Sequence, residues 1–208
     1  MKVIGITGGV GAGKSEVLKY IQEQYNCRVI LADDVGNEVK LPGNACYEAL
    51  IEVLGRDILT KEGFIDKQKM ADKIFCNQSL LQKVNEIIHP AVIDYILKER
   101  DKEKKVGKLD FFFIEAALLI ECGFLSYVDE MWYIYADEQV RSKRLTESRQ
   151  YSKEKILAVM KGQLSEQQFR ENCDRVIDNS KDFETTKQQI DKILGDELWK
   201  MQKNTRDN

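Results

Sequence analysis

Residues 5–16, GITGGVGAGKSE, lie almost at the amino terminus and contain five glycines among twelve residues. Glycine is costly in regular structure, so such a run marks a sharp turn or a close approach to the backbone. The preceding segment, Lys2–Thr7, is apolar and β-branched like a buried strand. After the run, Val17, Leu18 and Ile21 recur at helical spacing. The sequence therefore predicts a strand, a glycine-rich loop and a helix in succession.

Part of this run matches the nucleotide-binding pattern G-x-x-x-x-G-K-[S/T], through Gly8, Gly13, Lys14 and Ser15. Such a P-loop surrounds a polyphosphate with backbone amides at the positive end of a helix dipole. We expect Lys14 to neutralise charge on the β- and γ-phosphates and the Ser15 hydroxyl to ligate Mg²⁺. The alternative is a plain glycine-rich turn, but the flanking strand and helix favour the P-loop.

The composition suits one α/β domain with insertions, because 208 residues with 43% hydrophobic side chains supply ample core material. The net charge of −3 gives no overall basic field and argues against nucleic acid as a partner. Before the glycines stand one lysine and a short apolar run, which resemble neither a signal peptide nor a membrane span. We therefore expect a cytoplasmic protein without a membrane partner.

Cysteine usage indicates reduced, structural thiols. The cysteines are odd in number, widely spread and without a C-x-x-C pair, and the chain has one histidine to assist metal binding. They are Cys27, Cys46, Cys76, Cys122 and Cys173.

Strand-like and helical segments alternate along the chain. Such alternation implies βαβ units, a parallel sheet covered on both faces, and ligands at the carboxyl ends of the strands. After the first strand, the β-rich segments are residues 28–31, 109–114, Glu130–Tyr135 and Arg175–Asp178.

Two regions between predicted strands are too long for the single crossover helix of a βαβ unit. Helical periodicity at Tyr47–Leu54, Lys67–Phe75 and 80–97 predicts a helical insertion over residues 35–106. A charged helical region at 138–170 could be a lid, whereas most charge runs are solvated helix faces. We favour the solvated face for its lysines.

Carboxylates follow two of the predicted strands. Asp33, after the second strand, could orient an acceptor hydroxyl and accept its proton. The alternative is that Asp33 or Asp34 caps the following helix, which we favour for Asp34. Glu115, at the end of the third strand, is a candidate for holding magnesium or its water. The only histidine, His89, is by itself more typical of a structural role.

Taken together, these motifs resemble the dephospho-CoA kinase family over nearly the whole chain. The P-loop is shared by many families, whereas the later motifs are far more specific. After the P-loop the motifs run in order: Ala32-Asp33, Pro42-Gly43, residues 55–59 (GRDIL), 63–66 (GFID) and 74–75 (IF), His89-Pro90, 117–121 (ALLIE), Arg144, Arg149, Gln163 and 174–179 (DRVIDN).

The resemblance implies a fold and a reaction. The fold is the three-layer P-loop NTPase fold with a five-stranded parallel sheet, a helical substrate-binding insertion and a lid. The reaction transfers the γ-phosphoryl group of ATP to the ribose 3′-hydroxyl of dephospho-CoA, giving coenzyme A and ADP in the last step of coenzyme A synthesis. ATP and dephospho-CoA are the implied ligands and Mg²⁺ the implied cofactor; the oligomeric state is not implied.

The resemblance also implies roles for individual residues, and it favours function for His89. The implied catalytic residues are Asp33 as base, Lys14 and Arg144. The implied ATP-binding residues are Gly11, Ala12, Gly13, Lys14, Ser15, Glu16 and Arg149. The acceptor would lie toward His89 and Glu121, and the metal toward Ser15 and Glu115.

Several positions depart from the family pattern. Leu31 stands where the family commonly has the first aspartate of Asp-Ala-Asp, so the base rests on Asp33 alone. Glu16 replaces a threonine, Glu115 replaces an aspartate and Asn37 replaces an arginine. The lid spacing around the arginines is shifted by one residue.

Two other functions compete with this interpretation. One is a P-loop kinase acting on another small-molecule hydroxyl. The other is a GTP-binding switch, since residues 33–36 (DDVG) match the D-x-x-G pattern, but the chain contains no Asn-Lys-x-Asp segment for guanine.

Overall fold

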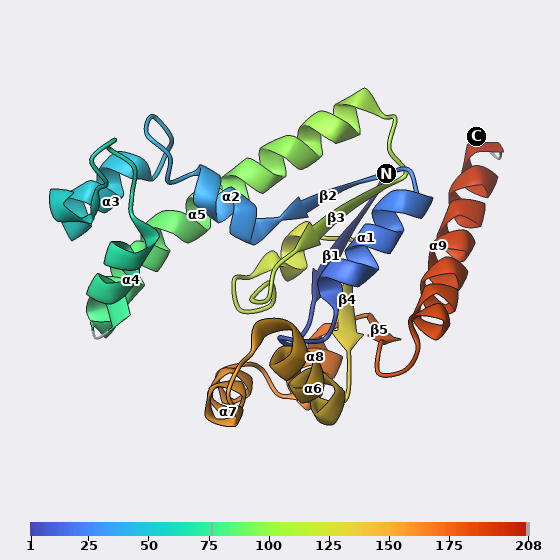
Figure 1. Ribbon diagram of the computed structural model, residues 1–208. Helices are drawn as coiled ribbons and strands as arrows, with labels where there is room; N and C mark the ends of the chain where they lie inside the picture. The colour runs from blue at the N-terminus through green and yellow to red at the C-terminus, as the bar shows by residue number, and fades with distance from the viewer. Residues whose placement is uncertain (76, 207–208) are drawn as a thin grey trace. The chain divides into compact units, whose positions relative to one another are not determined.

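The computed structural model describes residues 1–75 and 77–206 and shows the predicted alternation of strands and helices (Figure 1). The elements are β1 (Lys2–Thr7), α1 (Lys14–Gln24), β2 (Cys27–Leu31), α2 (Ala32–Glu38), α3 (Tyr47–Leu54), η1 (Arg56–Ile58), α4 (Lys67–Phe75), α5 (Gln78–Val106), β3 (Phe111–Glu115), η2 (Phe124–Tyr127), β4 (Glu130–Tyr135), α6 (Glu138–Arg149), α7 (Lys153–Lys161), α8 (Glu166–Asn172), β5 (Arg175–Asp178) and α9 (Phe183–Arg206).

The chain divides into two compact units. One comprises Met1–Val29 and the chain from Gly107 onward, and it carries the glycine-rich loop; the other comprises Ile30–Val106 and carries α2 to α5. The residues predicted as an insertion, 35–106, fall inside the second unit.

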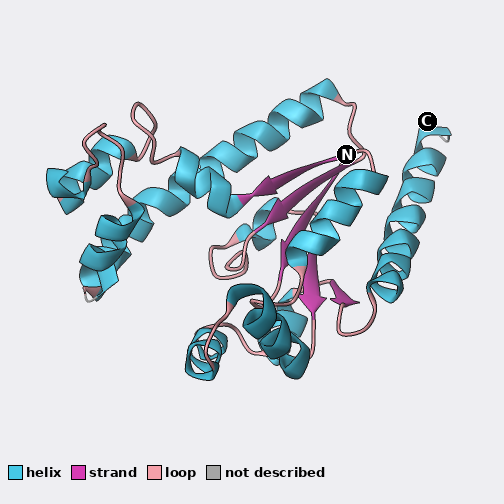
Figure 2. Ribbon diagram, in the orientation of Figure 1, coloured by secondary structure: helices cyan, strands magenta, loops and turns pink. Residues whose placement is uncertain are grey.

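The strands form one parallel sheet in the order β2-β3-β1-β4-β5 (Figure 2). The central strand β1 pairs with β3 on one side, where Ile6 is opposite Glu115, and with β4 on the other, where Thr7 is opposite Tyr133. The glycine-rich loop follows β1 directly. It therefore lies at the carboxyl end of the middle strand, where ligands bind in parallel α/β sheets.

One face of the sheet packs against α1 and α9, which lie side by side in Figure 1. Alternate residues of each strand point to this face, as the two-residue period of a strand requires. Phe113 and Trp132 meet edge to face with ring centroids 6.0 Å apart. The buried residues on this side include Ile4, Ile6, Val17, Ile21, Phe111, Phe113, Trp132, Ile134, Ile177, Ile190 and Leu194.

The other face is also buried, so the sheet has helices on both sides as parallel sheets generally do. Tyr133 of β4 stacks on Phe169 of α8, with ring centroids 4.6 Å apart and planes inclined by 10°. Val3, Phe112 and Ile114 are fully buried on the same side. This arrangement fixes α8, and with it the end of the region predicted as a lid, against the sheet.

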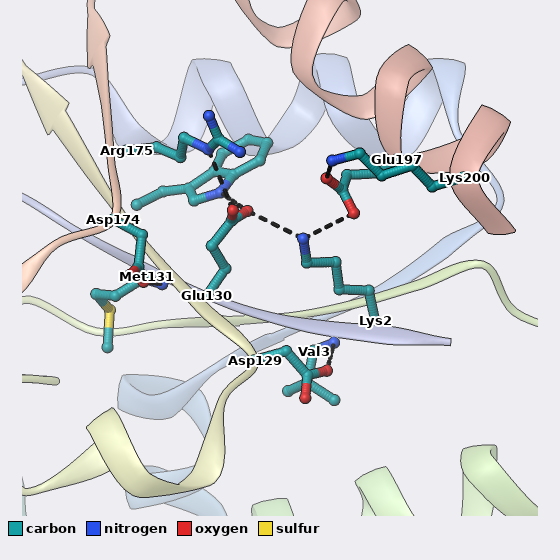
Figure 3. Close-up of polar contacts among 10 residues, drawn as sticks. Lys2, Val3, Asp129, Glu130, Met131, Asp174, Arg175, Glu197 and Lys200 are labelled. Atoms are coloured by element: carbon teal, nitrogen blue, oxygen red, sulfur yellow. Dashed lines mark hydrogen bonds and ion pairs between the residues drawn. The ribbon is translucent and has the colours of Figure 1, made fainter.

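A cluster of charges lies at the amino ends of the strands, away from the P-loop (Figure 3). Lys2 Nζ lies 2.8 Å from a carboxylate oxygen of Glu197 on α9 and 3.4 Å from Glu130 on β4. Arg175 of β5 donates to Glu130 at 3.1 Å, and Lys200 pairs with Glu197 at 2.7 Å. Both carboxylates are mostly buried, so the cations compensate for their lost hydration and join α9 to three strands.

In the second unit, α5 is longer than the periodicity predicts, running over Gln78–Val106 instead of 80–97. Its last turns, residues 98–106, carry eight charged side chains and Val106, and Lys102 lies 3.9 Å from Glu99 on their surface. Apolar periodicity does not detect such a solvated turn. None of the described helices combines the length and the apolar character that a membrane crossing requires.

Four cysteines fall within the described residues, and all four are free thiols: Cys27, Cys46, Cys122 and Cys173. Burial raises the pKa of the Cys27 thiol to about 11 and that of Cys173 to about 12. These two thiols therefore stay protonated and unreactive near neutral pH. Cys76 lies outside the described residues.

Candidate active site

The loop after β1 has a conformation that only glycine adopts readily. Gly8, Gly11 and Gly13 have φ values of 147°, 81° and 90°. A Cβ on Gly8 would stand 2.4 Å from the carbonyl oxygen of Ile134, and one on Gly13 would stand 2.3 Å from Asn179 Nδ2. The glycines are thus required both by the turn and by the groups that pack against it.

The loop leads into the amino terminus of α1. Gly13 is the N-cap residue and makes no side-chain cap, while its carbonyl oxygen accepts hydrogen bonds from the N–H groups of Glu16 and Val17. The N–H groups of Lys14 and Ser15, at the first two helical positions, have no acceptor within the helix itself. Together with the positive end of the helix dipole, this terminus is suited to an anion such as phosphate.

Lys14 spans the loop. Its Nζ donates to the carbonyl oxygen of Gly8 at 2.9 Å and lies 3.5 Å from Oε1 of Glu115. Glu115 reaches this point because it ends β3, beside Ile6 of β1. Both side chains are mostly buried. The structure therefore brings together two of the residues that the sequence predicts for the site, one cation and one carboxylate.

The outer side of the loop is held by side chains from distant parts of the chain. Arg141 of α6 donates from Nε to the carbonyl oxygen of Val10 at 3.0 Å. Gln163, between α7 and α8, accepts the Val10 N–H and the Arg141 Nη2 group, both at 3.1 Å. Both backbone groups of Val10 are thus bound by residues of the region predicted as a lid.

A second pair of donors binds the carbonyl group of Ala12. The carbonyl oxygen of Ala12 accepts from Asn179 Nδ2 at 2.8 Å and from Arg144 Nη1 at 3.3 Å. Arg144 also donates from Nη2 to the carbonyl oxygen of Asn179 at 3.0 Å. Arg144, which the resemblance assigns to the site, therefore lies directly against the P-loop.

Arg141 and Asn179 are not among the residues to which the sequence assigns a separate role. A signal for Arg141 existed, since it precedes Arg144 by three residues and both therefore lie on one face of α6. Asn179 carried no comparable local signal. It reaches the loop because its backbone N–H continues the β4–β5 ladder by donating to Tyr135.

The remaining charges of α6 point outward. Lys143 is 75% exposed and lies 4.0 Å from Glu147, which confirms the solvated-face interpretation for this lysine. Arg149 is the last residue of α6 and is exposed. Ser15 and Glu16, in the first turn of α1, are also exposed.

The predicted base lies in the second unit. Asp33 and Asp34 are exposed in the first turn of α2, whose N-cap residue is Leu31 without a side-chain cap. The prediction that either aspartate caps this helix is therefore wrong, because both stand inside the first turn and not at the cap. Burial and the charge of Lys67 lower the pKa of Lys40, while the charge of Asp33 opposes that shift.

The two residues assigned to the acceptor lie in different units. His89 is half-buried in α5, directly before Pro90. Glu121 is exposed in the turns that follow β3. After burial, the charge of Glu121 is the next cause of the raised pKa of the Cys122 thiol.

The donor set fits a cation that is held mainly by its substrate. Among the described residues there is no cluster of three or more acidic, histidine or cysteine side chains able to bind a metal by themselves. Magnesium in phosphoryl-transfer sites takes one or two protein ligands and completes its shell with phosphate oxygens and water. A serine hydroxyl in the first turn of α1 and a carboxylate beside Lys14 match that requirement.

Comparisons with known proteins agree with this geometry. The sequence profile of the family described as dephospho-CoA kinase matches residues 2–185. A dephospho-CoA kinase of Carboxydothermus hydrogenoformans is 35% identical over 200 residues, covering 96% of each chain. One of Oceanobacillus iheyensis is 34% identical over 192 residues, covering 92% of this chain and 96% of that protein. The solved dephospho-CoA kinase from Campylobacter jejuni shares the fold, with a TM-score of 0.71 at 20% identity over 93% of this chain and 95% of its own.

Proposed function

Because the chain belongs to the dephospho-CoA kinase family, we propose that it transfers the γ-phosphoryl group of ATP to the ribose 3′-hydroxyl of dephospho-CoA. The products are coenzyme A and ADP. The observation that carries the proposal is the P-loop itself, in which Lys14 Nζ binds the carbonyl oxygen of Gly8 at the amino terminus of α1.

The P-loop binds and orients the donor. Backbone N–H groups of Gly11, Gly13, Lys14 and Ser15 hold the phosphates. Ala12 shapes the same loop, since its N–H donates to the Gly9 carbonyl oxygen at 3.1 Å, and Glu16 belongs to the first turn of α1. Lys14 places its charge where negative charge accumulates on the oxygens of the transferring group. Charge neutralisation at that point lowers the barrier more than it strengthens ground-state binding.

Asp33 acts as the general base. It orients the acceptor hydroxyl and takes its proton as the new O–P bond forms, while the bond between the γ-phosphorus and the β,γ-bridging oxygen breaks and ADP leaves. Its exposed carboxylate, in the first turn of the helix that follows β2, supports this role.

Ser15 and Glu115 would hold Mg²⁺ together with the phosphates of ATP. The cation, when bound, neutralises charge on the β- and γ-phosphate oxygens. Because Glu115 also lies beside Lys14, it keeps that ammonium group at the end of β3.

The remaining assigned residues act around the reacting groups. Arg144 donates from Nη1 to Ala12 and from Nη2 to Asn179, so it holds the P-loop and adds positive charge beside it. Arg149 contributes a second positive charge toward ATP, and His89 and Glu121 contact dephospho-CoA. We place the reaction in the cytoplasm, without nucleic-acid or membrane partners; the net charge of −3 favours small-molecule ligands.

The decisive experiment incubates the purified protein with ATP, Mg²⁺ and dephospho-CoA and measures both ADP release and the mass of the product. We expect the acceptor to gain one phosphoryl group. AMP, CMP and shikimate serve as alternative acceptors, and GTP as an alternative donor. ADP release that depends on one of these and not on dephospho-CoA would contradict the proposal, as would tight GTP binding without turnover.

A further inference from the structure

We propose that Asn179, held in place by Thr186, is a positioning residue that aims the Gly13 N–H of the P-loop at the bound phosphates. The inference rests on the proposed function for the identity of the donor, ATP. Asn179, directly after β5, and Thr186, on α9, both lie outside the P-loop sequence pattern.

Hydrogen bonds hold both the side chain and the backbone of Asn179. Its side chain is fully buried, and its Nδ2 donates to the Ala12 carbonyl oxygen at 2.8 Å while its Oδ1 accepts from Thr186 Oγ1 at 2.9 Å. Its backbone N–H donates to Tyr135 at 2.8 Å and its carbonyl oxygen accepts from Arg144 at 3.0 Å. Because both ends of the amide are occupied, its orientation is fixed: the nitrogen faces the P-loop and the oxygen faces Thr186.

The direction of the Gly13 N–H follows from the geometry of the peptide between Ala12 and Gly13. In a trans peptide the C=O and the N–H point in opposite directions from one plane. Two donors, on Asn179 and Arg144, bind the Ala12 carbonyl oxygen. The Gly13 N–H must therefore point away from both donors, and its direction is set by the position of the Asn179 amide.

The Asn179 amide packs tightly against the backbone of Gly13. A Cβ at Gly13 would stand 2.3 Å from Asn179 Nδ2, so the backbone and the amide are in direct contact. In a P-loop, N–H groups at the helix amino terminus point at the phosphates. A shift or reversal of the Asn179 amide would therefore turn a phosphate donor without touching the phosphate site.

The chain offers a matched pair of threonines for the test. Thr186 is buried and donates to Asn179, whereas its neighbour Thr185 donates to Asp182 at 2.9 Å at the start of α9. Thr186→Val keeps the shape and removes the hydroxyl, Thr186→Ser restores the hydroxyl, and Thr185→Val removes the neighbouring hydroxyl. Asn179→Asp replaces the donor to Ala12 by a carboxylate oxygen.

The experiment measures the dissociation constant of ATP with Mg²⁺ by titration calorimetry, without an acceptor, and then kcat and both KM values. We expect Thr186→Val to weaken ATP binding about ten-fold, with Asn179→Asp at least as severe, because a fixed buried hydrogen bond is lost. The KM for dephospho-CoA should change little. Thr186→Ser and Thr185→Val should bind ATP like the parent.

Equal ATP affinity in the parent and Thr186→Val, measured on folded protein at a temperature well below both melting transitions, would overturn the proposal. An equal loss in Thr185→Val and Thr186→Val would also overturn it, because the effect would then belong to α9 in general. If the parent binds ATP but does not phosphorylate dephospho-CoA, the proposed function fails, whereas the affinity series still decides the role of Asn179.

Discussion

Lys14 and Glu115 form an ion pair, Nζ to Oε1 3.5 Å, although they belong to different segments of the chain and meet only because β1 and β3 are neighbours. The pair places a cation and a carboxylate at the carboxyl end of the sheet, beside the amino terminus of α1. The cation is suited to phosphate and the carboxylate to a divalent metal or its water. Each side chain can be replaced alone, so that the contribution to phosphate and the contribution to metal are tested separately.

Replacing Lys14 by alanine should cripple turnover and leave the fold intact. We expect kcat to fall by about a hundred-fold or more, because positive charge is removed from the transferring phosphoryl group. The melting temperature should change far less than after truncation of a core residue. Lys19→Ala is the control, since Lys19 lies on the same helix and is 77% exposed. A Lys14→Ala protein with normal activity and a core-like loss of stability would remove Lys14 from the site.

Replacing Asp33 by asparagine separates catalysis from binding. If Asp33 deprotonates the acceptor, kcat should fall by about two to four orders of magnitude while ATP affinity stays close to that of the parent. Asp34→Asn is the matched control, because Asp34 is also exposed in the first turn of α2. A kcat within a few-fold of the parent would move the search for the base to Asp34 or Glu115.

Replacing Arg144 by alanine should lower kcat more than it raises the KM for dephospho-CoA, since its positive charge beside the P-loop stabilises negative charge that develops during transfer. ATP binding should weaken as well, because the Ala12 carbonyl group loses one of its two donors. Lys143→Ala, at the exposed neighbouring position, should behave like the parent. An unchanged kcat in Arg144→Ala would make this arginine a structural residue only.

Replacing Glu115 by glutamine should raise the Mg²⁺ concentration needed for half-maximal activity, because a neutral amide is a poorer ligand than a carboxylate. The measurement is initial rate against free Mg²⁺ at saturating ATP. Glu23→Gln is the control on α1, where the carboxylate is 56% exposed and lies outside the site. If the Mg²⁺ dependence of Glu115→Gln matches that of the parent, Glu115 does not serve the metal.

The charge cluster at the opposite end of the sheet predicts a pH-dependent stability. Hydrogen bonds from Lys2 and then Lys200 hold the pKa of Glu197 below its ordinary value of 4.5. A carboxylate with a depressed pKa stabilises the folded state above the pKa of the unfolded chain, and this contribution is lost as pH falls through the folded-state pKa.

Glu197→Gln should therefore lower the free energy of unfolding by about 2 kcal/mol near neutral pH. The difference from the parent should shrink below about pH 4, where the carboxylate becomes protonated. Urea unfolding at both pH values measures it. Glu184→Gln is the control, since the ion pair of Glu184 with Lys187 on the surface of α9 should contribute under about 1 kcal/mol. A difference that does not depend on pH would contradict this account.

Local patterns along the chain were sufficient for much of the fold. The glycines of residues 5–16 specified the turn because only glycine adopts positive φ without cost, and the apolar periods specified the strands and most helices. The apolar period could not indicate the end of α5, because eight of residues 98–106 are charged. The predicted acceptor and the role of His89 came from resemblance to a known family, because no local pattern in the sequence indicates them.

The sequence by itself determined that residues 8–15 form a P-loop, since a short segment carries the glycines, the lysine and the serine together. Only the tertiary structure decided what holds that loop: Arg141, Gln163, Arg144 and Asn179 bind its carbonyl and N–H groups from more than 130 residues away in sequence. Those contacts arise from the order of the strands and the packing of α6 and α9. The physical reason is that hydrogen bonds and ion pairs depend on distances in space, and sequence separation does not encode them until the sheet has brought the segments together.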